Sequence, residues 1–245
     1  MRRFLAIAAW PTVAVLLAVG ALCQWRLMAH RPAGALATAE SAFAALGGLR
    51  SIAAEAVWFR ADRLQEEGRY VELAQLAHAL TLSEPHTPEV WSYAAWNLAY
   101  NVSVMMPTDE DRWRWVYAAI RLLRDEGLRY NPRSAEIHRE LAMLFELKLG
   151  LDTDSAAATY RRHWREIVTD VAARGAWGEL GMELPEMAAV ERLYGVTDRA
   201  SPLYSAIYWA HRGLAFPDAR MSPFLKDVIV QSQAILSRQA EGKRK

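Results

Sequence analysis

The chain has one cysteine among its 245 residues, and its other scarcities exclude several classes of function. Cys23 alone can form neither an intramolecular disulfide nor a cysteine-based metal site. The six histidines lack the spacing of a zinc motif, and there is no glycine-rich phosphate loop, nucleophile elbow or c-type haem motif. We therefore expect no metal, no cofactor and no small-molecule substrate, and we predict that the protein is not an enzyme.

An excess of charge of one sign is also absent. The chain has 29 basic and 28 acidic residues, which gives a formal net charge of +1. Such a balance produces no long-range attraction to a polyanion, so we expect no nucleic-acid partner. Lysine is scarce, with only four among the 29 cations, a bias typical of GC-rich bacterial coding sequences.

The one long apolar run lies near the N-terminus. Residues 4–25 contain no charged side chain, and a helix of this length spans a hydrocarbon core of about 30 Å. Small residues suited to signal-peptide cleavage come only at 33–39, well after the run, and Leu22 before Cys23 does not suit a lipoprotein site. The run predicts an uncleaved single-pass anchor within residues 1–31, in a bacterial inner (cytoplasmic) membrane. We place the soluble domain on the extracytoplasmic side and expect residues 32–53 to form a helical stalk.

After the stalk, apolar residues recur at spacings of three and four, the pattern of paired amphipathic helices. Residues 56–85 break at a glycine and end at a proline. In these features the segment resembles a tetratricopeptide repeat, although two family positions differ, with Val57 in the tryptophan position and Leu73 in a small-residue position. The matching positions are the small residue Ala61, the turn glycine Gly68, the aromatic Tyr70 and the closing Pro85.

Two further units follow the first. Trp91 stands six residues after Pro85, where the family has its opening tryptophan, and Pro132 closes this unit. The two prolines are 47 residues apart, whereas the family period is about 34, so we expect an insertion near 102–112 with Thr108 capping the helix after it. A third unit has Gly150 as its turn glycine. The three units cover residues 54–167.

Residues 168–245 have a looser pattern, which predicts an irregular helical region, a partial fourth repeat and a final capping helix. The predicted fold is therefore all-α: an N-terminal transmembrane helix followed by a tetratricopeptide-like α-solenoid of helical hairpins, with a C-terminal capping helix.

The resemblance implies a groove that binds a protein partner. Trp96 and Tyr100 are four residues apart and share a helix face, so they either anchor a bound segment or pack within the chain. Asn97 and Asn101 either hold the backbone of a bound peptide or bond to the loop around Pro107. The residues expected to line the groove are Trp58, Asp62, Gln65, Trp96, Asn97, Tyr100, Asn101, Arg139 and Glu146.

Two functions fit these expectations. The first is a membrane-tethered scaffold or adaptor, similar to tetratricopeptide-repeat proteins, that binds a protein partner in a membrane or envelope complex. The alternative is an accessory subunit or enzyme of the cell envelope, with the solenoid built around an active carboxylate. A carboxylate of raised pKa in a closed pocket favours the alternative, and an open aromatic groove favours the adaptor.

Overall fold

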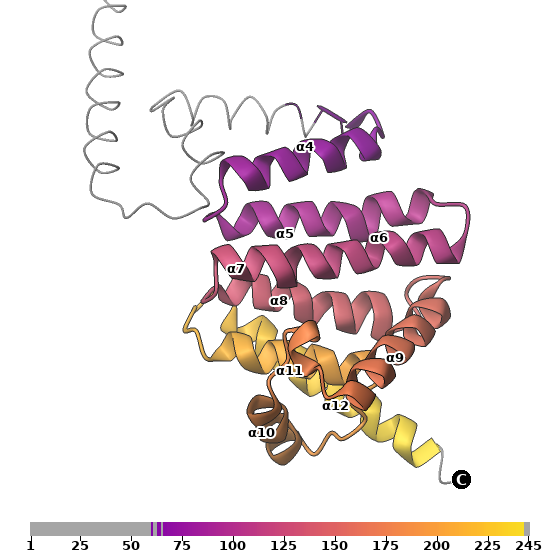
Figure 1. Cartoon of the computed structure of the whole chain (residues 1–245), viewed down its shortest axis with the longest axis vertical. Helices are drawn as coiled ribbons and strands as arrows, with labels where there is room; N and C mark the ends of the chain where they lie inside the picture. Colours follow the sequence, from indigo (N-terminus) through magenta and orange to yellow (C-terminus); the bar gives the residue numbers. More distant parts are fainter. Residues whose placement is uncertain (1–59, 61–62, 65, 243–245) are drawn as a thin grey trace, which may run out of the picture. The chain divides into compact units, whose positions relative to one another are not determined.

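The computed structural model describes Arg60, residues 63–64 and residues 66–242. These residues form helices and loops with no β-strand among them, which confirms the all-α class (Figure 1). Within the same ranges no helix has both the length and the apolar character needed to cross a bilayer. The predicted anchor, the stalk and the groove residues Trp58, Asp62 and Gln65 lie outside the described residues.

The chain divides into two compact units, Met1–Glu84 and Pro85–Lys245. In the first unit the described helix is α4 (Tyr70–Ser83). The turn before it is made at Gly68, whose φ of 69° lies in the left-handed region that favours glycine. On α4, Leu73, Ala77 and Leu80 are buried, as the spacing of three and four predicts.

The second unit begins with a hairpin of two long helices. Only Met106 to Thr108 separate them, so the expected insertion at 102–112 forms the end of one helix and the start of the next. Thr108 Oγ1 accepts a hydrogen bond from the backbone N–H of Asp111 at 3.1 Å, which confirms the predicted cap. The first helix comprises α5 (Pro88–Trp96), the π-helical η1 (Asn97–Val102) and the 3₁₀ turn η2 (Ser103–Met105); the second comprises α6 (Asp109–Arg121), the π-helical η3 (Leu122–Gly127) and α7 (Leu128–Tyr130).

Trp91 joins the two ends of this hairpin. Its indole Nε1 donates to the carbonyl oxygen of Pro85 at 2.8 Å, and its ring stacks on Tyr130 with centroids 5.7 Å apart. Asn131 Nδ2 donates to the same carbonyl at 2.8 Å. The tryptophan expected six residues after the proline is therefore a fully buried structural residue.

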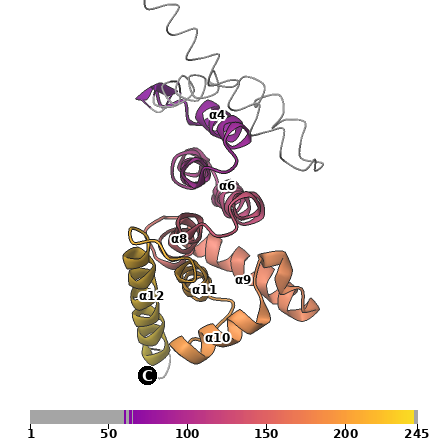
Figure 2. The same cartoon turned by 90° about the vertical axis from the view of Figure 1, so that its left-hand side faces the viewer.

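The next helix pair is α8 (Ala135–Met143), which continues through the π-helical η4 (Leu144–Gly150), and α9 (Ala157–Arg174). Ser134 Oγ caps α8 by accepting from the N–H of Ile137 at 3.2 Å. Within the second unit, α8 and α12 lie along one side and α6 and α9 along the other (Figure 2).

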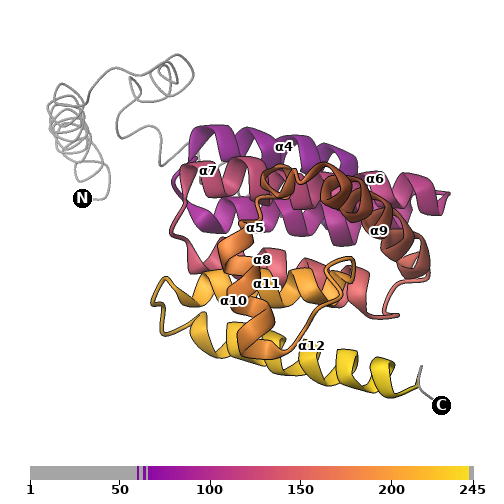
Figure 3. The same ribbon diagram turned by 60° about the horizontal axis from the view of Figure 1, so that its bottom comes forward.

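The remaining elements are η5 (Trp177–Leu180), α10 (Leu184–Tyr194), α11 (Pro202–Leu214) and α12 (Ser222–Gly242). Helix α11 lies between α8 and α12, and α10 crosses α11 at an angle (Figures 2 and 3). Every residue from Ser201 to Ala210 is buried. The segment expected as a partial fourth repeat is therefore the centre of the core, and α12 covers it.

Candidate functional site

An exposed tryptophan stacked on a half-buried tyrosine stands on the first helix of the second unit. The side chain of Trp96 is 41% exposed, and its ring stacks on that of Tyr100 with centroids 6.1 Å apart and planes at 28°. The spacing of four residues aligns them along one face of α5 and η1, as predicted. An exposed large aromatic side chain held by a neighbour is a common feature of protein-binding surfaces.

A buried ion pair supports Tyr100. The ammonium of Lys148 lies 5.0 Å from the centroid of the Tyr100 ring and 2.5 Å from Asp154 Oδ2. Burial raises the pKa of Tyr100 well above its usual value, and the nearby Glu140 carboxylate adds to this effect. The Tyr100 hydroxyl therefore keeps its proton and can act as a hydrogen-bond donor.

Helix α8 places a charged pair beside the aromatic pair. Arg139 Nη2 donates to Glu140 Oε1, and the Arg139 guanidinium lies 5.8 Å from the ring centroid of Phe224 on α12. Phe224 is 54% exposed. We name this surface the α8 face; its residues are Trp96, Tyr100, Arg139, Glu140 and Phe224.

Carboxylates dominate the charge around the α8 face. Burial raises the pKa of Glu140, and burial together with the nearby Glu89 raises the pKa of Glu136. The Ser92 hydroxyl and the guanidiniums of Arg139 and Arg220 offset the rise in the pKa of Glu136 only partly. A carboxylate of raised pKa is one whose charge lacks full solvation, so an added cation nearby stabilises it.

The structure brings three of the predicted groove residues together and turns two inward. Trp96, Tyr100 and Arg139 lie on the α8 face, whereas Asn97 and Glu146 are buried. The predicted groove residues do not include Glu140 and Phe224. Only the position of α12 beside α8 brings Phe224 here, and no spacing in the sequence encodes that contact.

The contacts of the two asparagines contradict the predicted bond to the loop around Pro107, and the peptide interpretation stays a prediction. Asn101 Nδ2 donates to Asn97 Oδ1 at 3.0 Å, so the two amides bond to each other and not to the loop around Pro107. Glu146 accepts a hydrogen bond from Ser232 Oγ of α12 at 3.2 Å, and burial raises its pKa. Its carboxylate lies in a helix interface and does not line the cavities found along α9 and at the end of α10.

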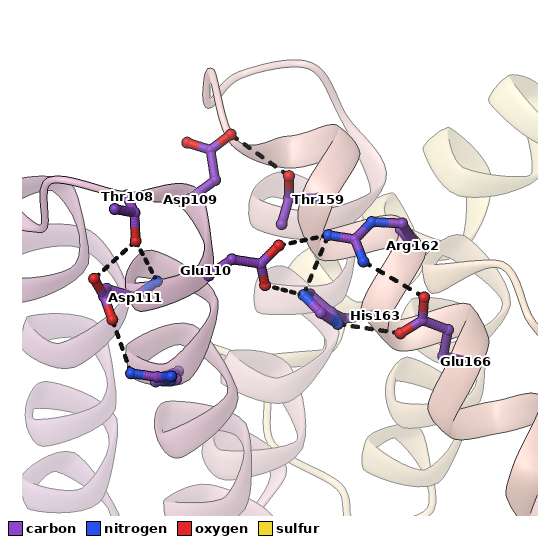
Figure 4. A network of polar contacts seen from close by, with 9 residues as sticks. Thr108, Asp109, Glu110, Asp111, Thr159, Arg162, His163 and Glu166 are labelled. Carbon is purple, nitrogen blue, oxygen red and sulfur yellow. Dashed lines mark hydrogen bonds and ion pairs between the residues drawn. The ribbon is translucent and has the colours of Figure 1, made fainter.

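On the other side of the second unit, a polar network joins α6 to α9 (Figure 4). Glu110 Oε1 accepts from Arg162 Nη2 at 2.6 Å, Glu110 Oε2 meets His163 Nε2, and His163 Nδ1 lies 3.2 Å from Glu166 Oε2. His163 and Arg162 hold the pKa of Glu110 below its usual value. Glu110 and Glu166 each have Arg162 and His163 as partners, so these contacts join the two helices.

Trp113 explains how this network is attached to the core. Its buried ring stacks on the His163 imidazole with centroids 5.4 Å apart. Trp115, two residues on, is partly exposed. The two tryptophans therefore take different faces, as expected for an alternating pair on a helix.

A comparison with models of protein families, with curated proteins and with solved structures finds no match to this chain. Its function is therefore inferred from the geometry and chemistry of its own residues.

Proposed function

We propose that this chain is a membrane-tethered scaffold, similar to tetratricopeptide-repeat proteins, that binds a protein partner across the α8 face within a membrane or envelope complex. The observation that carries this proposal is the exposed Trp96 ring, held in place by stacking on Tyr100. An ordered aromatic side chain loses little conformational entropy on binding, which is why such residues are frequent binding hot spots.

The architecture supports the comparison with repeat scaffolds. The helix running from Pro88 to Met105 pairs with the helix running from Asp109 to Tyr130, and α8 with η4 is followed by α9. In a stack of such pairs, the first helix of each pair lines a common surface. Trp96 and Arg139 both lie on first helices of these pairs.

The chemistry of the α8 face indicates what the partner presents. An apolar side chain packs on Trp96, and a lysine or arginine reaches the carboxylates of Glu136 and Glu140. The Tyr100 hydroxyl donates a hydrogen bond to a carbonyl of the partner. An amphipathic helix with one basic residue beside its apolar stripe meets all three requirements.

The proposed tether is the uncharged run from Phe4 to Trp25, with the described units on the extracytoplasmic side of a bacterial inner membrane. Protease treatment of intact spheroplasts tests this placement. Digestion of the C-terminal domain in spheroplasts supports it, and protection until the membrane is permeabilised contradicts it.

The binding face is tested by affinity capture from detergent-solubilised membranes. Trp96→Ala removes the exposed ring, and Leu193→Ala on α10 is a matched control because Leu193 is also exposed but lies away from the α8 face. We expect Trp96→Ala to keep its helical circular dichroism and to lower the affinity for the captured partner by at least about tenfold. Leu193→Ala should bind like the wild type. Equal capture by both folded variants would show that the partner binds elsewhere.

A second pair of variants tests the proposed charge complementarity. Glu136→Lys reverses a charge beside Arg139 of the α8 face, and Glu179→Lys makes the same change on η5. We expect only Glu136→Lys to weaken binding, by about tenfold and more strongly at low salt, since screening reduces electrostatic repulsion. Equal weakening by both variants would mean that overall charge, not this face, determines the effect.

A further inference from the structure

A cavity of about 410 Å³ lies between α10 and the C-terminal end of α11. Its polar lining is Glu186, Tyr194, His211 and Arg212, and its apolar lining includes Leu214 and Phe216. This volume falls within the range of small-molecule sites, about 300–1,000 Å³. The proposed scaffold function does not involve any of these residues.

The tyrosine and the histidine of this cavity orient each other. Tyr194 Oη lies 3.1 Å from His211 Nδ1, and the two rings pack edge to face with centroids 5.6 Å apart. Burial raises the pKa of Tyr194 and lowers the pKa of His211, so the phenol keeps its proton and the imidazole is neutral. Tyr194 therefore donates to Nδ1, and the imidazole carries its own hydrogen on Nε2.

Glu186 has an oxygen free to accept a further hydrogen bond. Its Oε1 lies 3.3 Å from Arg212 Nη1, while its Oε2 lies 3.8 Å from His211 Nε2. A separation of 3.8 Å is longer than a hydrogen bond. Since Glu186 is only partly exposed, this oxygen gains from a donor that enters the cavity.

The charged groups near the cavity are Glu186, Arg212 and Glu183. Arg212 is paired with Glu186 and also with Glu183, whose Oε1 is 3.1 Å from Arg212 Nη2. One guanidinium therefore faces two carboxylates, and the neutral His211 adds no charge. Of these three charged groups only Glu186 and Arg212 line the cavity, whereas Glu183 is 60% exposed and lies outside the lining, so an entering ammonium finds its acceptor in Glu186 Oε2.

Aromatic walls suit the body of such a ligand. Tyr194 and Phe216 both line the cavity, and the Phe216 ring is held against His138 with centroids 5.3 Å apart. Faces of aromatic rings attract cations and pack against apolar groups. Leu214 adds an aliphatic surface.

We propose that this cavity binds a small primary ammonium ion with an aromatic or aliphatic body. The ammonium donates to Glu186 Oε2, and the body packs against Tyr194, Leu214 and Phe216. The proposal is independent of partner binding at the α8 face, because that face shares no residue with the cavity lining.

Calorimetric titration of the full-length protein with 2-phenylethylammonium chloride, using 2-phenylethanol as the uncharged comparison, tests this proposal. We expect saturable binding of the ammonium ion and binding at least about tenfold weaker for the alcohol, because the alcohol lacks the charge that Glu186 needs. Glu186→Gln should also weaken ammonium binding about tenfold, and Phe216→Ala should weaken binding of both probes. Leu193→Ala, on the same helix as Glu186, should bind like the wild type.

Each alternative outcome overturns the proposal. Absence of saturable ammonium binding shows that the cavity is not a site for this class. Equal affinity for ammonium and alcohol, or an unchanged affinity in folded Glu186→Gln, shows that the carboxylate does not recognise the ligand. If Glu186→Gln does not fold, the comparison of the two probes on the wild type still decides the question.

Discussion

The ammonium of Lys148 and the carboxylate of Asp154 form an ion pair from which water is nearly excluded. The Nζ–Oδ2 distance is 2.5 Å, and the two side chains are 4% and 6% exposed. Tyr160 Oη donates to the same oxygen at 3.4 Å, and Arg112 Nη1 lies 3.5 Å from Asp154 Oδ1. The pair joins the end of η4 to the start of α9 and lies beneath Tyr100 of the α8 face.

Removing the carboxylate charge of Asp154 should cost more stability than removing the ammonium charge of Lys148. Asp154→Asn keeps an oxygen that can accept from the Ala156 N–H, as Asp154 Oδ1 does at 2.9 Å, but leaves the Lys148 ammonium buried without a counter-charge. We expect a loss of about 3–5 kcal/mol in the free energy of unfolding. Lys148→Met should lose less, because Asp154 keeps Arg112 beside it.

Urea unfolding followed by tryptophan fluorescence measures these losses. Lys148→Met combined with Asp154→Asn should be more stable than Asp154→Asn alone, because the combined variant has no unpaired ammonium. A combined loss equal to the sum of the single losses would show that the two charges do not interact.

Local features of the fold follow from the sequence because they depend on neighbouring residues. The turn at Gly68, the cap at Thr108 and the burial of Trp91 six residues after Pro85 were all predictable. The turn, the cap and the hydrogen bond from Trp91 to Pro85 each lie within one short segment, whereas the stacking of Trp91 on Tyr130 does not.

The π-helical segments explain why the position of Glu146 was not predicted. Counting 3.6 residues per turn from Arg139 places Glu146 on the same face, but η4 starts at Leu144 and has a wider turn. One additional residue in a turn rotates the later side chains of the helix by about 100°. Glu146 consequently meets Ser232 of α12, a contact between residues 86 positions apart.

The close approach of α11 to Gly150 predicts that any side chain at this position is destabilising. A Cβ added to Gly150 would overlap Leu203 Cδ2 and would lie 3.0 Å from both Leu203 Cγ and the carbonyl oxygen of Phe145. We expect Gly150→Ala to lower the free energy of unfolding by about 1–3 kcal/mol. At Gly178 an added Cβ meets nothing within 4 Å, so Gly178→Ala should change stability by less than about 0.5 kcal/mol. Urea unfolding measures the loss of stability in each variant. Equal losses in the two variants would contradict the close packing of Leu203 against Gly150.

His138 should make the protein less stable in mild acid. Its buried imidazole donates from Nδ1 to the carbonyl oxygen of Ser134 at 2.7 Å, and burial lowers its pKa from 6.5 to about 4. The folded state therefore favours the neutral ring, so this contribution to stability is complete above pH 6.5 and is lost as the pH falls from 6.5 towards 4. The total loss is about 3 kcal/mol.

His138→Asn tests this pH dependence, because the asparagine amide can still donate to Ser134 but does not titrate. We expect the variant to be less stable than the wild type at neutral pH, owing to its smaller volume, and the difference between the two to shrink as the pH falls. Urea unfolding midpoints of both proteins, measured between pH 6.5 and pH 4, give this difference in stability. A difference that stays constant with pH would show that His138 is not the titrating group.

Replacing Glu146 by glutamine should stabilise the protein. Burial raises the pKa of this carboxyl, so the protonated form suits the folded state. Its contribution to stability is complete below the unfolded-state pKa, near 4.5, and is lost as the pH rises through the higher folded-state pKa. Glutamine is neutral at every pH and can still accept from Ser232 Oγ. We expect Glu146→Gln to raise the melting temperature at neutral pH by about 2–4 °C, the effect of about 1 kcal/mol in a chain of this size, and to have no effect in strong acid.

Ser232→Ala should act in the opposite direction at neutral pH, because it removes the hydroxyl that stabilises the charged form. A Glu146→Gln protein less stable than the wild type at neutral pH would mean that the charged carboxylate is stabilised by groups other than Ser232.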